Sequence, residues 1–138
     1  MLLSAPARAV DYAEGQVWEY QTRPGEEGSL LKIAKVETVE KLGPIFHISL
    51  SGLRVSVPRV SNARLTELPH LPVSKQTLDQ SVTKLSTATF EAVDFAPGYD
   101  EWRRSFDQGR AGVFTISVAQ IVGVVEEALN KGAPSVKQ

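Results

Sequence analysis

The chain has 138 residues, of which 42% are apolar and 22% are charged, as in ordinary globular proteins. This length suits one hydrophobic core and leaves no room for two, so we expect one soluble domain over residues 15–131, preceded by a flexible segment at residues 1–14 and followed by a disordered tail at residues 132–138. The 15 basic and 16 acidic residues give a net charge of −1, which provides no general electrostatic reason to bind nucleic acid or an anionic membrane.

The first residues, MLLSAPARA, leave two interpretations open. Ala7, Arg8 and Ala9 have the form of a signal-peptidase site, and Leu2 and Leu3 resemble the end of an apolar stretch. However, no charged region precedes them, and the apolar run is too short to direct export. The segment is either the remnant of a truncated signal peptide, which implies a periplasmic protein, or the frayed end of a cytoplasmic one. No stretch approaches the roughly 18 apolar residues of a membrane span.

The first predicted strand covers residues 16–22, where side chains of the two faces alternate. Trp18 and Tyr20 share one face and give it an aromatic character. Pro24 and Gly25 follow at the two central positions of a type II turn, since proline presets one dihedral angle and glycine supplies a positive one.

A second strand is predicted over residues 29–39. Its apolar positions change face between Ile33 and Val36, which indicates a bulge or a strong twist near Ala34. Two further strands are predicted at residues 45–50 and 53–57. Because short links join these strands, we expect them to pair as an antiparallel meander.

The pattern fades over residues 58–73, where several prolines indicate a long loop. Ser74 is then predicted to cap a helix, because its hydroxyl can accept a hydrogen bond from a first-turn amide. The apolar stripe of this helix is predicted to be Leu78, Val82 and Leu85.

Two more helices are predicted over residues 99–108 and from Ser117 to about Gly132, after a turn at Pro97 and Gly98. Tyr99, Trp102 and Phe106 have helical spacing in the first of them. Ser117 and Gln120 have the spacing of a capping box at the start of the second. The buried face of the last helix is predicted to contain Val118, Ile121, Val122, Val125 and Leu129.

These elements indicate an α+β fold. An N-terminal antiparallel sheet of three to five strands is expected to be covered on one face by two or three C-terminal helices. The other face carries Lys32, His47 and Ser49 and is less apolar, so it is either solvated or a contact surface.

The chain contains no cysteine, which excludes disulfides and thiolate nucleophiles, and its only histidines are His47 and His70. Either is a candidate general base, because imidazole titrates near neutral pH. Packing is the alternative role for His47 in mid-strand, and simple exposure is the alternative for His70 between two prolines. Their spacing matches no metal motif, and nucleotide-binding and nucleophile motifs are missing, so no cofactor, metal or catalytic residue is predicted.

Two charged groups are candidate contact sites. The turn with Arg23, Glu26 and Glu27 presents an arginine and two carboxylates, although a solvated hairpin loop has the same composition. Trp102 and Arg103 have the composition of an interface hot spot, although an ion-paired helix face with a buried tryptophan also explains them.

Six stretches form a distinctive set: residues 15–27 (GQVWEYQTRPGEE), 47–49, 70–74, 81–85, 101–103 and 112–118. Together they resemble a group of short, uncharacterised bacterial single-domain proteins, over most of the chain from Gly15 to Leu129. The resemblance implies a stand-alone domain and brings no activity, cofactor or catalytic residue.

We therefore predict a non-enzymatic module that binds another protein, such as an inhibitor or immunity-type protein. Its predicted binding residues are Arg23, Glu26, Glu27, His47, His70, Trp102 and Arg103. One alternative is a small hydrolase with a histidine base, which requires His47 or His70 to meet a carboxylate and a hydroxyl in a concave site. Another is a small-ligand pocket lined by Trp18, Tyr20 and Trp102.

Overall fold

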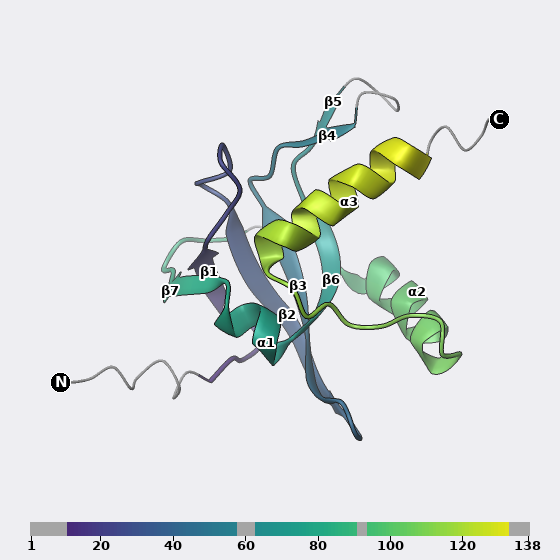
Figure 1. Cartoon of the computed structure of the whole chain (residues 1–138). Helices are drawn as coiled ribbons and strands as arrows, with labels where there is room; N and C mark the ends of the chain where they lie inside the picture. The colour runs from purple at the N-terminus through teal and green to yellow at the C-terminus, as the bar shows by residue number, and fades with distance from the viewer. Residues whose placement is uncertain (1–10, 58–62, 91–93, 133–138) are drawn as a thin grey trace.

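The computed structural model describes residues 11–57, 63–90 and 94–132. In this part of the chain, five strands form one antiparallel sheet in the order β6-β3-β2-β1-β7, and three helices pack around it, which confirms the α+β prediction (Figure 1). The elements in chain order are β1 (Val17–Tyr20), β2 (Leu30–Val39), β3 (Gly43–Ser51), β4 (Val55–Val57), β5 (Ala63–Leu65), β6 (Leu68–Ser74), α1 (Lys75–Asp79), β7 (Val82–Leu85), α2 (Ala96–Asp107) and α3 (Val118–Gly132). The predictions for residues 1–10 and 133–138 lie outside the described residues.

β2 and β3 form a long hairpin whose end projects beyond the rest of the sheet (Figure 1). The register of this pair shifts just before Lys35, which confirms the bulge expected near Ala34. Beyond the bulge, Val36 packs with the core, while Lys35 and Glu37 lie on the opposite face with His47. The bulge therefore decides which face of the sheet receives Glu37.

The first face of the sheet carries the hydrophobic core, which α1 and α3 cover. Trp18 and Tyr20 of β1 are 5% and 6% exposed and pack with apolar residues of the neighbouring strands. Tyr12 packs edge-on against Trp18 and Phe46, with ring centroids 5.7 and 5.5 Å away. The packed part of the chain thus includes Tyr12 and begins before Gly15, where the domain was predicted to start.

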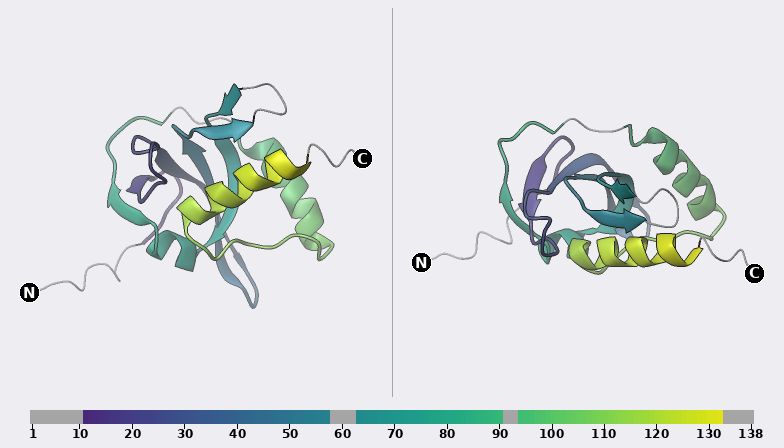
Figure 2. Two further views of the ribbon diagram at one scale, coloured as in Figure 1. Left: turned by 45° about the horizontal axis from the view of Figure 1, so that its top comes forward. Right: turned by 90° about the horizontal axis from the view of Figure 1, so that it is seen from above.

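Two helices, α1 and α3, cover one face of the sheet, as expected, whereas α2 lies on the other side (Figure 2). His47 and Ser49, expected on a half-polar face, are 0% and 1% exposed. Tyr99 and Trp102 of α2 pack against the His47 ring at centroid distances of 4.8 and 4.9 Å. The aromatic side of this helix therefore buries a polar part of the sheet.

The expectation of one long loop at residues 58–73 is wrong. β6 occupies its second half and pairs with β3 at the edge of the sheet. Pro69 and Pro72 are tolerated there because an edge strand does not need every backbone N–H for a neighbour. The Pro72 carbonyl accepts a hydrogen bond from the Phe114 N–H at 2.9 Å. β4 does not continue the meander either, because it pairs with β5 in a separate two-stranded sheet.

The helix predicted after Ser74 is only five residues long. Ser74 caps it through its hydroxyl, as expected. Val82 and Leu85 belong instead to β7, which pairs with β1, so their helical spacing was misleading. The competing interaction is tertiary, since the Ser81 carbonyl accepts from the Gln21 N–H at 2.9 Å and the chain joins the sheet.

The other two helices begin differently, since α3 has a side-chain cap and α2 has none at Phe95. The capping box of α3 is confirmed, with the Ser117 N–H donating to Gln120 Oε1 at 3.1 Å and the Gln120 N–H donating to Ser117 Oγ at 3.2 Å. Leu129, predicted on the buried face of this helix, is 37% exposed. Pro97 and Gly98 belong to the first turn of α2 rather than to a preceding turn, a position that proline favours.

Candidate functional site

Glu37, His47 and His70 form a continuous hydrogen-bonded chain across β2, β3 and β6. His47 Nε2 lies 2.7 Å from Glu37 Oε1, and His47 Nδ1 lies 2.9 Å from His70 Nε2. His47 is fully buried between its two partners. The two histidines therefore belong to one site, which we call the Glu-His-His cluster.

The hydrogen bonds assign the protons of the neutral cluster. An ionised Glu37 can only accept, so His47 carries its proton on Nε2 and donates it to the carboxylate. His47 Nδ1 is then an acceptor, and His70 donates to it from Nε2. His70 Nδ1 is then the one imidazole nitrogen of the cluster that is left as a free acceptor. Among the described residues, no group donates a hydrogen bond to it.

α2 binds the same carboxylate. The Tyr99 hydroxyl donates to Glu37 Oε1 at 3.0 Å, and an Arg103 guanidinium nitrogen donates to Glu37 Oε2 at 2.9 Å. Trp102, between them on the helix, packs against His47. One carboxylate thus joins the helix to the buried histidine.

The charges around Glu37 keep it ionised. Burial acts to raise the pKa of Glu37. Hydrogen bonds from Tyr99 and His47, together with the positive charge of Arg103, outweigh burial and hold the pKa of this carboxyl below its ordinary value.

Both histidines are held neutral near pH 7. Burial lowers the pKa of His47, and this effect exceeds the raising effect of Glu37. The positive charges of Lys35 and Arg103 lower the pKa of His47 further. Burial, and then the proximity of His47, lower the pKa of His70 to about 4.

The cluster meets only part of what a hydrolase requires. His47 contacts a carboxylate, as that hypothesis demanded. However, Ser49, two residues along the same face, donates its hydroxyl to the Pro69 carbonyl at 2.7 Å, and Tyr99 donates its hydroxyl to Glu37. Among the described residues, no hydroxyl bonds to either histidine, and no group of three or more histidine or carboxylate side chains is placed to hold a metal ion.

Arg23 and Glu26, predicted as contact residues, are paired within the molecule. Arg23 donates to both oxygens of Glu26 at 3.0 and 2.9 Å, and to Glu126 of α3 at 2.9 Å. Glu26 is 2% exposed and also accepts from the Arg54 N–H at 2.8 Å, so the expectation of a fully solvated turn is wrong for this residue. Glu27 is exposed. The two ion pairs of Arg23 join the β1–β2 turn to α3.

The three aromatic residues expected to line a ligand pocket do not meet. Trp18 and Tyr20 are packed into the core on the first face of the sheet. Trp102 packs against His47 on the second face. The structure therefore separates these rings by the sheet itself.

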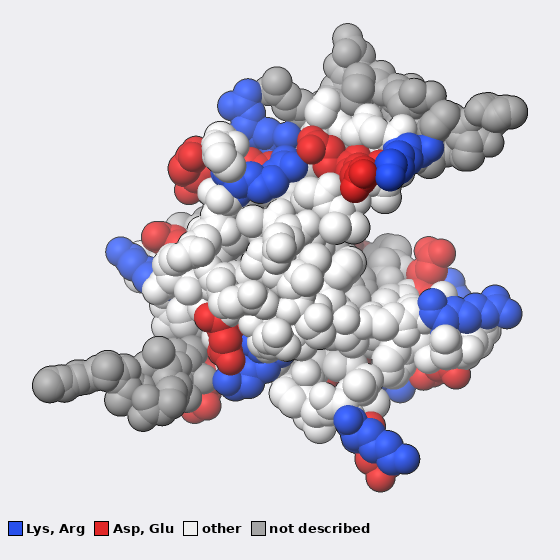
Figure 3. Space-filling model, in the orientation of Figure 1, with Lys and Arg blue, Asp and Glu red and all other residues white. Residues whose placement is uncertain are grey.

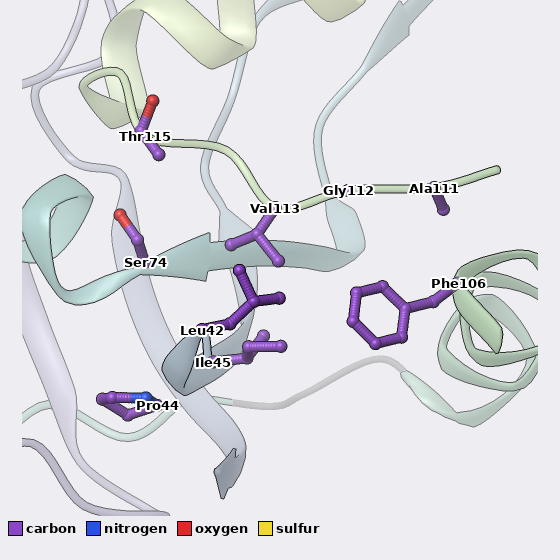
Figure 4. Close-up of a pocket in the computed structure, with 9 residues that line it drawn as sticks. All are labelled: Leu42, Pro44, Ile45, Ser74, Phe106, Ala111, Gly112, Val113 and Thr115. Atoms are coloured by element: carbon purple, nitrogen blue, oxygen red, sulfur yellow. The ribbon is translucent and has the colours of Figure 1, made fainter. Parts of the chain in front are cut away.

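A different concave surface lies beside the end of the β2–β3 hairpin. It is a groove of about 300 Å³, which we call the hairpin groove, and its lining residues are all uncharged. They are Leu42, Pro44, Ile45, Ser74, Phe106, Ala111, Gly112, Val113 and Thr115. Val113 points toward Leu42 and Ile45, and the ring of Phe106 faces them from α2 (Figure 4).

The hairpin turn beside the groove has two features that do not stabilise the fold. Leu42 is 58% exposed, the highest exposure of a large apolar side chain in the described part of the chain. Lys41, just before it, has a φ of 77°, in the left-handed region that favours glycine. This conformation costs a lysine about 1 kcal/mol or more.

The sequence patterns did not indicate Glu37, Tyr99 or Leu42 as site residues. Glu37 had a usable signal, because a bulge near Ala34 places it on the face of His47. Leu42 also had one, since it is a leucine within a turn. Tyr99 was recognised only as part of an apolar helix face.

Comparison with known proteins supplies no relative for this chain. No protein-family model matches it, and neither the curated proteins nor the solved structures contain a significant match. Within the described residues, no helix has both the length and the apolar character needed to span a membrane.

Proposed function

We propose that the protein is a non-enzymatic module that binds another protein through the hairpin groove, with Leu42 at its rim. The observation that carries the proposal is an uncharged groove beside an exposed leucine on a strained turn. Selection for stability alone disfavours both the exposed leucine and the left-handed lysine, so a contact with a partner is a reason to keep them.

The surroundings of the groove fit a protein partner. Protein interfaces have an apolar centre and a polar rim. Glu40, Lys41, Asp107 and Arg110 flank the groove in sequence and are all exposed, which supplies such a rim. Figure 3 shows that the neighbouring surface, over the first half of α3 and the segment before it, is largely free of charged side chains.

Three of the seven residues predicted to bind a partner support this surface indirectly. His47, His70 and Trp102 support α2, which contributes Phe106 to the groove. Arg103 is 37% exposed but is paired with Glu37 and Asp107. We therefore place the proposed contact surface at the β2–β3 hairpin and not at the β1–β2 turn.

Site-specific photocrosslinking tests the proposal. A photoreactive amino acid replaces Leu42 in one protein and Leu129, an exposed leucine of α3, in the control. In extract of the cells that make the protein, we expect a discrete adduct with one protein from position 42 and none from position 129. The same adducts from both positions, or none from position 42, would count against the groove as the contact surface.

A histidine-dependent hydrolase is the second candidate, because His47 contacts a carboxylate and His70. It predicts hydrolysis of small ester or amide substrates that the His70→Gln variant lacks. A screen in which the wild type and His70→Gln have the same background rate would dispose of it.

A further inference from the structure

α2 rests directly on the Glu-His-His cluster. Tyr99 and Arg103 bond to Glu37, and the rings of Tyr99 and Trp102 pack on His47. The backbone of α2 also packs closely against His70. A Cβ atom placed on Gly98 would lie only 3.1 Å from the His70 Cβ. The position of α2 therefore depends on contacts with both imidazoles and with Glu37.

The hydrogen bond between the histidines limits how many protons the closed structure can hold. The neutral pair has one N–H between His47 Nδ1 and His70 Nε2, which lie 2.9 Å apart. One added proton preserves the bond, since either nitrogen can donate it to the other. A second added proton places two N–H groups against each other, so the contact becomes repulsive.

The other charges around the pair oppose the second proton. Lys35 of β2 lies over the Tyr99 ring, 5.4 Å from its centroid, and Arg103 reaches the site from α2. Glu37 is the carboxylate of the cluster, and it already binds His47, Tyr99 and Arg103. Two imidazolium groups would therefore meet two further cations around a single anion.

We propose that the Glu-His-His cluster is a pH switch, which holds α2 against the sheet at neutral pH and releases it in mild acid when both histidines are protonated. In the released form, water solvates both rings, and each takes up a proton near its ordinary pKa of about 6.5. The closed form binds fewer protons than the released form between pH 4 and 6.5, so acid shifts the equilibrium toward release.

Release of α2 would also alter the hairpin groove, since Phe106 forms one of its walls. This consequence rests on the proposed function, whereas the switch itself does not. Partner binding that weakens in mild acid would then accompany the structural change. The experiment below needs no partner, so it tests the switch separately from the groove.

Hydrogen exchange of the full chain at pH 7.5 and pH 5.0 tests the switch. After correction for intrinsic exchange rates, protection of α2 is compared with protection of α3, which lies on the other side of the sheet and serves as an internal reference. An undocked helix of 12 residues is only marginally stable in water, so its amides exchange once α2 is released. A histidine whose pKa changes from about 4 to about 6.5 favours release roughly 10- to 30-fold more at pH 5.0 than at pH 7.5.

We therefore expect α2 to lose about tenfold more protection than α3 between these pH values. In the His70→Gln variant, the side-chain amide can still bond to His47 Nδ1 but cannot be protonated, so the extra loss should disappear. Parallel loss in both helices, or an unchanged loss in His70→Gln, would overturn the proposal.

A measurement on the wild-type chain covers the case in which His70→Gln does not fold. The chain has only two histidines, so its imidazole NMR signals can be followed individually. The switch requires uptake of the second proton and loss of the native α2 signals to have the same midpoint. Native α2 signals that persist after both imidazoles are protonated would contradict it.

Discussion

The two histidines of this chain face each other inside the protein, with His47 Nδ1 and His70 Nε2 only 2.9 Å apart. Two neutral rings share a hydrogen bond at this distance, whereas two protonated rings repel each other. The packing of α2 on the second face of the sheet therefore depends on the protonation state of these two histidines. No sequence motif indicates that they form a pair.

Thermal stability should fall in mild acid. The pKa of His70 is lowered to about 4 in the folded protein, so the unfolded chain binds this proton more readily between pH 6.5 and 4. The stabilisation by neutral His70 is present above pH 6.5 and is lost as the pH falls toward 4. We expect a loss of about 1 kcal/mol at pH 5, allowing for solvent screening, or a Tm decrease of roughly 3–5 °C.

Glu37 acts in the same direction at lower pH. Its folded pKa is below the ordinary value, so its stabilisation is lost only as the pH falls below about 4.5. Differential scanning calorimetry from pH 7 to pH 4 should show both effects, the first of which His70→Gln removes. An identical Tm at pH 7 and pH 5 in the wild type would contradict this account.

Gly98→Ala should destabilise the protein. The new methyl group would lie 3.1 Å from the His70 Cβ, an atom fixed to strand β6 that cannot move away cheaply. We expect a loss of about 1–2 kcal/mol in urea unfolding. Gly123→Ala is the matched control, because nothing lies within 4 Å of the added atom in the interior of α3, and it should gain about 0.5–1 kcal/mol. Equal effects of the two substitutions would show that α2 is not packed closely on His70.

The sequence predicted those features that depend on neighbouring residues. The bulge near Ala34 and the caps at Ser74 and Ser117 follow from local patterns, and all three are present. The aromatic face of β1 is another such feature, since Trp18 and Tyr20 both enter the core.

Long-range pairing accounts for the features that were missed. Pro69 and Pro72 argued against a strand at β6, because proline is tolerated only in an edge strand. Whether a segment lies at the edge is decided by the whole sheet and not by its own sequence. Val82 and Leu85 have helical spacing, but pairing with β1 decides their conformation. The candidate site was the least predictable feature, because His47 and His70 meet only through the register of β3 and β6.

Glu26→Gln should weaken the fold by removing a buried charge. Glu26 is 2% exposed, accepts two hydrogen bonds from Arg23 and binds the Arg54 N–H. Loss of one partner of a buried ion pair costs about 2–4 kcal/mol, which a shift of the urea midpoint would reveal. Glu27→Gln, next to it and exposed, should leave the midpoint unchanged. A similar shift from both variants would show that the ion pair does not stabilise the turn.

Lys41→Gly should stabilise the protein. Lys41 has a φ of 77°, which glycine adopts without steric cost. We expect a gain of up to about 1 kcal/mol in the free energy of unfolding, from urea titration. Glu40→Gly, at the preceding position without positive φ, is the control and should not stabilise. A loss of stability in Lys41→Gly would mean that the turn is not strained.

Affinity capture with two leucine variants tests the proposed contact surface most directly. Leu42 and Leu85 are matched, with exposures of 58% and 51%, and only Leu42 lines the hairpin groove. Wild type, Leu42→Asp and Leu85→Asp are immobilised in equal amounts, after circular dichroism has shown that all three are folded, and captured proteins are quantified by mass spectrometry. We expect one stoichiometric partner with the wild type and with Leu85→Asp, and its loss with Leu42→Asp. A partner that Leu42→Asp retains, or that both variants lose equally, would contradict the proposal that the hairpin groove is the binding surface.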